Sequence, residues 1–151
     1  MTAIELLESL ASGLRSAVKG LKYPAQYQEN KAVTVYLQSI PVAEHETDTF
    51  YPLILIELLG IEDDVEKSTA SILITIITYD SDGRGFYDNF NIAERVRRWI
   101  LTNRLLESFA LEVPLTFGVV EKTEDDFWAS NFLATYQLMQ PDSNYDIEDI
   151  V

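Results

Sequence analysis

The stretch ILITIITYDSDGRGFYDNFNIAERVRRWIL, from Ile72 to Leu101, decides the fold. Its first part is a strand-length run of mostly β-branched residues that stops at a glycine-punctuated turn. Its second part places apolar residues at the i, i+3, i+4 and i+7 spacing of a helix that buries one face. The sequence therefore predicts a buried strand that leads, through the turn, into an amphipathic helix from Tyr87 to Glu107.

The exposed face of this helix carries arginines in an otherwise acidic chain. The chain has 25 acidic and 11 basic residues and a formal net charge of -14, and Arg95, Arg98 and Arg104 stand against that background. Affinity for a nucleic-acid backbone comes from Lys and Arg that displace counterions, so the overall charge argues against such binding. The local reversal of charge suits a self-complementary or partner-binding surface, and a solvated helix face is the plain alternative.

Length and composition indicate one domain. The chain has 151 residues, of which 47% are hydrophobic, enough for one core and too few for two comfortable domains. We expect a single domain over residues 1–141 and a flexible, acidic tail over residues 142–151. The absence of cysteine excludes a disulfide framework, a thiolate metal site and a cysteine nucleophile, and it fits a reducing cytoplasm. The start of the chain lacks signal-peptide features, and the apolar runs are too short to span a membrane.

The remaining elements follow from their patterns. Thr2 and Glu5 form a candidate capping box for a first helix that ends near Leu21. Residues 22–31 are expected to be a polar connector and residues 40–49 a loop. Strands are expected at Val33–Leu37, Phe50–Leu59, Ser68–Tyr79, Leu111–Val119 and Phe127–Leu138. The strand that contains Pro114 belongs at a sheet edge, because proline cannot donate to a ladder.

These elements predict an α+β fold, with a mixed, mainly antiparallel sheet of about five strands and two main helices. The central strands are apolar on both faces, since Leu53 and Leu55 alternate with Ile54 and Ile56. Both faces of the sheet must therefore be covered. Two arrangements remain open: one helix on each face, or both helices on one face and another subunit on the second. The second arrangement predicts a homo-oligomer.

Catalytic and metal-binding patterns fail on inspection. His45 is the only histidine and has no partner ligand at helical or hairpin spacing. The turn Asp80–Asn91 begins like a calcium loop, but Arg84 occupies its fifth position and Asn91 replaces the bidentate glutamate at its twelfth. It is better interpreted as a helix-capping turn, with Asp82 or Asp88 near the helix start.

Paired carboxylates are the remaining candidates for chemistry. They occur at Asp63–Asp64 and at Asp125–Asp126, both on expected hairpin tips. Neither pair lies in the apolar cleft that a glycosidase-like acid and base would need. We therefore predict no catalytic residue, no cofactor, no metal site and no enzyme activity.

The order of the expected elements resembles the tail terminator or tail completion (head-tail joining) proteins of long-tailed bacteriophages. The resemblance covers nearly the whole chain. The segments that carry it are FYPLILIELLG at Phe50–Gly60, ILITIITYDSDGRGFYDNFNIAERVRRWIL at Ile72–Leu101, LEVPL at Leu111–Leu115 and FWASNFLATYQLMQP at Phe127–Pro141.

The resemblance implies a virion structural protein, assembled in the host cytoplasm and located at the head-proximal end of the tail. Such a subunit forms a hexameric ring on the tail tube, stops tube polymerisation and joins the tube to the head completion or connector protein. Its implied partners are thus its own copies, the major tail tube protein and the connector, with no specific nucleic acid and no membrane.

The residues themselves suggest where such a ring closes. Acid-to-arginine pairing between neighbours would join the hairpin tip of one copy to the helix of the next. The candidate interface residues are Glu62, Asp63, Asp64, Glu66, Arg95, Arg98 and Arg104. The alternative functions are a small acidic regulatory protein such as a DNA mimic, whose carboxylates would form a continuous stripe, and a hydrolase built on one carboxylate pair.

Overall fold

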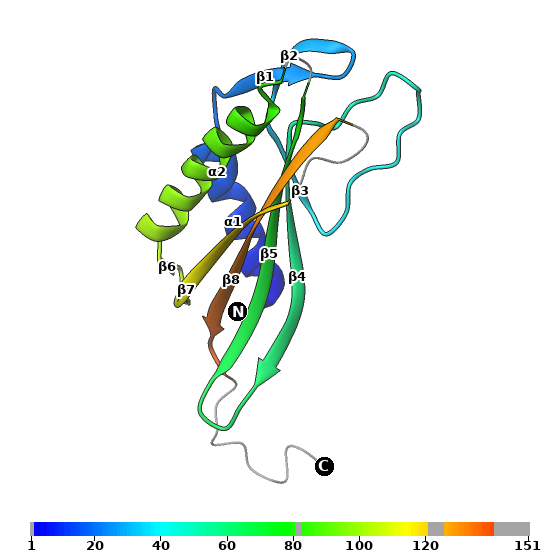
Figure 1. The fold of residues 1–151 in the computed structure, drawn as a ribbon. Coiled ribbons are helices and arrows are strands. Elements are labelled where there is room, and N and C mark those ends of the chain that lie inside the picture. The colour runs from blue at the N-terminus through cyan, green and yellow to red at the C-terminus, as the bar shows by residue number, and fades with distance from the viewer. Residues whose placement is uncertain (1, 81–82, 121–125, 141–151) are drawn as a thin grey trace.

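The computed structural model describes residues 2–80, 83–120 and 126–140 of the chain. The described helices are α1 (Ala3–Ala17) and α2 (Gly85–Thr102). The described strands are β1 (Lys22–Ala25), β2 (Gln28–Ala32), β3 (Thr34–Leu37), β4 (Leu53–Asp63), β5 (Ser68–Tyr79), β6 (Leu105–Leu106), β7 (Phe109–Val120) and β8 (Phe127–Leu138). Figure 1 shows their arrangement. The expected acidic tail at residues 142–151 lies outside the described residues.

The fold class is α+β, as the sequence predicts. A six-stranded sheet has the order β3-β4-β5-β8-β7-β6. Only β3 and β4 pair in parallel, and the other neighbours are antiparallel. The strand count was underestimated because the two-residue β6 has no periodicity to recognise.

The expectation of a connector at residues 22–31 was wrong. Strands β1 and β2 form a separate two-stranded antiparallel sheet. Tyr27 turns the chain between them with a φ of 67°. Strand β2 is mostly exposed, and the four residues of β1 do not alternate between buried and exposed, so neither shows the alternation of apolar residues that identifies a core strand.

Helix α1 begins with the predicted capping box. The Thr2 hydroxyl accepts a hydrogen bond from the Glu5 N–H at 3.3 Å, and the Glu5 carboxylate accepts one from the Thr2 N–H at 3.0 Å. The buried side chains of Leu6, Leu10 and Leu14 lie on one face of the helix. The helix ends at Ala17, and Gly20 follows with a φ of 88°.

Both helices lie on the same face of the sheet. Helix α1 packs against β3 and β4, while α2 packs against β5 and β8, and the two helices contact each other. On this face Ile72, Ile74 and Ile76 of β5 are fully buried. The opposite face, which we call the open face, has no helix over it in the described part of the chain. Of the two arrangements left open by the sequence, the structure adopts the one-sided one.

Polar side chains attach α2 to the sheet. The buried Asn89 side chain donates to the carbonyls of Ile76 and Trp128, both at 3.0 Å. At the helix start, the Gly85 N–H donates to the Asp80 carboxylate at 3.0 Å, and the Gly85 carbonyl accepts from the Thr78 hydroxyl at 2.8 Å. These hydrogen bonds fix the orientation of α2 near its start, where the chain arrives from β5.

The predicted bounds of α2 need correction. The helix runs from Gly85 to Thr102, and not from Tyr87 to Glu107. At its end the Asn103 side chain donates to the Trp99 carbonyl at 2.9 Å, which stabilises the stop that the apolar periodicity did not reveal. Asp88 lies in the first turn of α2, near the helix start as predicted, while Asp82 lies outside the described residues. The carboxylate that accepts the first helical N–H is that of Asp80.

Strand β4 also runs further than expected. It continues past Leu59 to Asp63, with a β-bulge between Leu58 and Gly60. The extension pairs with β5 but lies in solvent, so it carries no apolar pattern beyond the bulge. Strand β7 lies at the sheet edge, as Pro114 predicts, since β6 pairs only with Phe109 and Ala110.

Replacing Gly85 by alanine should destabilise the fold. A Cβ at Gly85 would lie 2.7 Å from both Asp80 Cβ and Trp128 Cδ1 and 2.9 Å from Asp80 Cα, so backbone must move. Crowding of this kind costs roughly 1–3 kcal/mol. Gly60→Ala is the matched control, because a Cβ there meets no atom within 4 Å. Urea unfolding of both variants checks this, and equal stabilities would contradict it.

Candidate assembly surfaces

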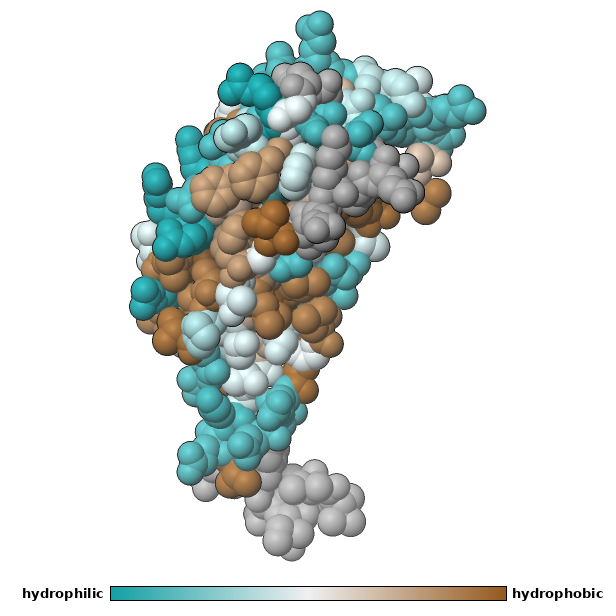
Figure 2. All heavy atoms as spheres, viewed as in Figure 1, coloured by the Kyte–Doolittle hydropathy of each residue, from teal (hydrophilic) through white to brown (hydrophobic). Residues whose placement is uncertain are grey.

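The open face combines apolar residues with short polar ones. Leu133 is 43% exposed and pairs across the strands with the half-buried Leu73. Thr75 and Asn131 pair beside them on the same face. Figure 1 shows the strands in front of α1, and Figure 2, which has the same view, shows apolar residues over the middle of the sheet. A surface of this kind, with few charges, is suited to contact with another subunit.

Aromatic residues cover one end of the open face. The rings of Tyr51 and Phe127 are 4.4 Å apart between centroids, and those of Tyr79 and Phe127 are 5.6 Å apart. Leu53, on the open face of β4 beside Ile77, is fully buried. Tyr51 and Phe50 are half-buried at this end of the sheet. Two other tyrosines, Tyr27 and Tyr87, are each 63% exposed.

The β4–β5 hairpin projects beyond the helical layer (Figure 1). Residues 59–67 are all exposed, and among them Leu59, Ile61 and Val65 are exposed by 55%, 50% and 93%. The predicted acidic residues Glu62, Asp63, Asp64 and Glu66 all lie here. Glu62 and Asp63 are strand residues and not turn residues, because β4 is longer than expected.

The tip of the hairpin is ordered by its own hydrogen bonds. The Asp64 N–H donates to the Lys67 carbonyl at 2.8 Å, and the Asp64 carboxylate accepts from the Val65 N–H at 2.6 Å. Lys67 forms an ion pair with Glu112 of β7 at 2.8 Å, and this hydrogen bond raises the pKa of Lys67. The carboxylates are therefore presented on a defined turn.

The three predicted arginines have different environments. Arg95 and Arg98 are exposed and line a hollow of about 420 Å³ together with Tyr23 and Asn91. Arg95 makes only a long 3.5 Å bond to the Ala17 carbonyl, and neither arginine forms an ion pair among the described residues. Arg104 lies beyond α2, and its Nε donates to the Leu101 carbonyl at 3.2 Å. Within the described part of one chain, no ion pair joins these arginines to the hairpin acids.

Sequence reasoning missed an aromatic flank on the other side of α2. We call Phe86, Phe90 and Arg97, with Phe117 of β7, the β7 flank. Phe86 and Phe90 are 37% and 43% exposed and stack with centroids 6.3 Å apart. Positions four and seven apart on a helix face the same side, so the spacing of Phe86, Phe90 and Arg97 could have revealed this surface. The arginines were instead treated as one group.

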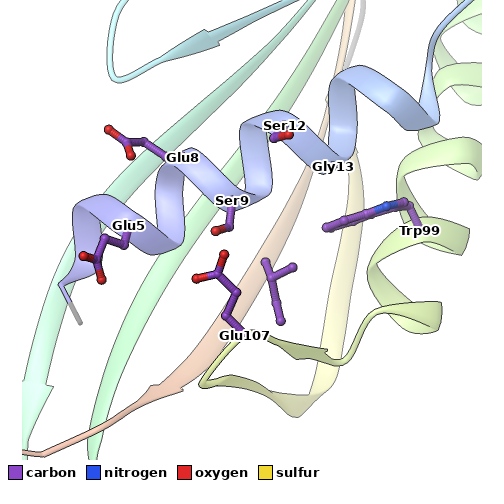
Figure 3. Close-up of a pocket in the computed structure, with 8 residues that line it drawn as sticks. Glu5, Glu8, Ser9, Ser12, Gly13, Trp99 and Glu107 are labelled. Atoms are coloured by element: carbon purple, nitrogen blue, oxygen red, sulfur yellow. The ribbon is translucent and has the colours of Figure 1, made fainter.

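A hollow of about 570 Å³ lies between α1, Trp99 of α2 and the residues that follow α2. Figure 3 shows the Trp99 ring beside Gly13, and the Ser9 and Glu107 side chains pointing toward one another. A Cβ on Gly13 would lie 1.9 Å from Trp99 Cζ2, so this glycine permits the close approach of the two helices. Glu5 and Glu8 also line the hollow, but Glu5 is engaged in the capping box.

The remaining candidates for chemistry are dispersed. His45 is exposed in the loop, and Asp63 and Asp64 are exposed on the hairpin, outside any apolar cleft. Asp125 lies outside the described residues. Among the residues that the structure describes, no group of three or more His, Cys, Asp or Glu side chains is placed to hold a metal ion. Neither described helix has the length and apolar character of a membrane span.

Comparison with known proteins adds little beyond the fold. No protein-family model matches the chain, and no curated protein matches it by sequence. Solved structures do match. One is a chain from the virion of a native gene transfer agent particle, at 16% sequence identity and a TM-score of 0.49, over 87% of this chain and 92% of that chain. A similarity this remote assigns neither a family nor a function.

Proposed function

We propose that this chain is a structural subunit of a phage or prophage tail. It acts as a tail terminator or completion protein, which caps the head-proximal end of the tail tube and joins it to the head connector. The observation that carries the proposal is the one-sided packing of the helices, which leaves the open face of an apolar sheet to another subunit. The whole-chain pattern that resembles the tail terminator family supports the same role.

Two further features support assembly. The β4–β5 hairpin exposes apolar residues that its own domain does not cover. The exposed arginines of α2, Arg95, Arg97 and Arg98, form no ion pair among the described residues, whereas the hairpin carries four carboxylates, Glu62, Asp63, Asp64 and Glu66. Copies of the chain would therefore complement one another in head-to-tail contact, and such contacts close into a ring when the rotation between neighbours allows it.

The charge of the chain fits a position on the path of DNA. A ring of subunits that each carry a net charge of -14 repels the DNA backbone, so DNA passes through its lumen without adhering. The partners in this proposal are other copies of the chain in a hexameric ring, the major tail tube protein and the head completion or connector protein. Assembly takes place in the host cytoplasm, and the role requires no cofactor and no catalysis.

Microscopy of the protein mixed with purified tail tubes tests the proposed function. We expect rings at one end of the tubes. A chain that stays monomeric both alone and with tubes would contradict the proposal. A pull-down that recovers a nuclease or polymerase instead of tail protein would favour the DNA-mimic alternative.

A charge on the open face should weaken assembly. Leu133→Glu replaces an exposed leucine of this face by a carboxylate that must be desolvated in the contact, and we expect association to weaken by about tenfold or more, or about 1.4 kcal/mol. Val42→Glu is the matched control, because Val42 is 89% exposed in the loop away from the sheet. Sedimentation velocity measures both variants, and equal association would contradict the role of the open face.

Reversal of Arg98 should weaken assembly and leave the fold intact. Arg98 is exposed and makes no ion pair among the described residues, so Arg98→Glu breaks no ion pair described within the monomer. Exposed ion pairs contribute less than about 1 kcal/mol, so we expect a loss of roughly two- to fivefold in association. Arg98→Gln should have an intermediate effect. If both variants assemble like the parent protein, Arg98 belongs to a solvated helix face.

A further inference from the structure

We infer that the β7 flank of one copy is the docking surface for the projecting β4–β5 hairpin of a second copy. This inference rests on the proposed function, since it specifies the contact that joins neighbouring subunits. It differs from the sequence prediction, because it assigns the hairpin to Phe86, Phe90 and Arg97; Arg95 and Arg98, on the other side of α2, are then left for a different contact of the assembly.

The edge of the sheet beside the flank is open. Strand β8 pairs with one side of β7, whereas β6 pairs with the other side only at Phe109 and Ala110. Within the described chain, the rest of that side of β7 has no strand partner. The pairing of β7 with β8 shifts register between Glu112 and Thr116, so Thr116–Val119 is the regular part of the free edge. An edge of this kind accepts another strand.

The flank is a fixed platform above this edge. The Phe90 ring lies 6.4 Å from that of Phe117, and Phe117 lies 4.7 Å from the buried Phe132. Phe86 contacts Trp128 in turn, with centroids 5.4 Å apart. The exposed rings are thus held by the core, and exposed aromatic residues held in this way are the anchors that dominate protein interfaces.

The hairpin has the complementary chemistry. Leu59 and Ile61 supply apolar side chains for Phe86 and Phe90, and the carboxylates of the tip supply charge for Arg97. Arg97 is exposed and forms no ion pair among the described residues. In a chain with more than twice as many acidic as basic residues, an exposed arginine on the same side of α2 as two exposed phenylalanines is a specific match for an acidic, apolar hairpin.

The topology directs the hairpin to a second copy. Strand β5 begins at the hairpin and ends at the turn into α2, and its twelve residues place the two ends about 40 Å apart. Figure 1 shows the hairpin projecting at the far end of the sheet from β1 and β2, beside which α2 begins. The two surfaces differ within one chain, so the contact between copies is head-to-tail and leaves one of each surface free for the next subunit.

Disulfide cross-linking tests the inference. The chain contains no cysteine, so every disulfide formed must join introduced cysteines. One variant carries Ile61→Cys and the other Phe90→Cys, and the two are mixed under oxidising conditions. We expect cross-linked dimers from the mixture at several-fold higher yield than from either variant alone. A chain with both substitutions should give a ladder of multimers. Val42→Cys replaces Phe90→Cys as the control and should cross-link to Ile61→Cys only at background yield.

Charge reversal at Arg97 tests the electrostatic part of the contact with the same cross-link. Adding Arg97→Glu to the Phe90→Cys variant should lower the cross-linking yield several-fold, and unfolding curves check that each variant is folded. Background yields, or cross-links from one variant alone, would overturn the inference. If rings still form on tail tubes in that case, the proposed function stands and only this contact is wrong. If neither rings nor cross-links form, both fail.

Discussion

The structure depends on one packing constraint: a sheet that is apolar on both faces is covered by helices on only one. The central strands β4 and β5 place isoleucines against α1 and α2, and those side chains are fully buried. The same strands place Leu55, Leu73 and Ile77 on the open face, where they stay half-buried. Because burial of apolar surface is the main stabilising contribution to folding, these partly exposed side chains contribute less than the buried ones, and in the proposed assembly a second copy would bury them further.

The other surface features are consistent with this constraint. The chain extends β4 and β5 beyond the helices and places apolar and acidic residues on the extension, which the domain itself cannot bury. Within the described chain, most of one side of β7 is also left without a strand partner, beside exposed phenylalanines. In the contact proposed above, a second copy would cover both features, since the hairpin supplies what the flank lacks.

The sequence predicts the core of this fold well, and the reason is periodicity. The capping box at Thr2, the strand at Ser68–Tyr79 and the edge position of Pro114 each follow from a local rule, and each is confirmed. The errors occur where local patterns carry no information. The end of α2 depends on the Asn103 side chain, β1 and β2 show no apolar alternation, and the length of β4 follows from its partner strand.

The candidate site was predictable only in part. Glu62, Asp63, Asp64 and Glu66 lie together on an exposed hairpin, as their sequence proximity requires, and Arg95 and Arg98 share one hollow. Arg104 was grouped with them on a helix that ends before it. The side of the sheet on which the helices pack, and hence the surface left open, depends on contacts between distant elements that no single segment encodes.

Amide hydrogen exchange over a series of protein concentrations tests the central claim most directly, namely that the surfaces left open by one domain are covered by neighbouring copies. Raising the concentration should slow exchange in the β4–β5 hairpin and along Thr116–Val119 of β7, and leave the loop at residues 40–49 unchanged. Exchange that is independent of concentration at all three places, up to the highest concentration at which the protein stays in solution, would contradict the account.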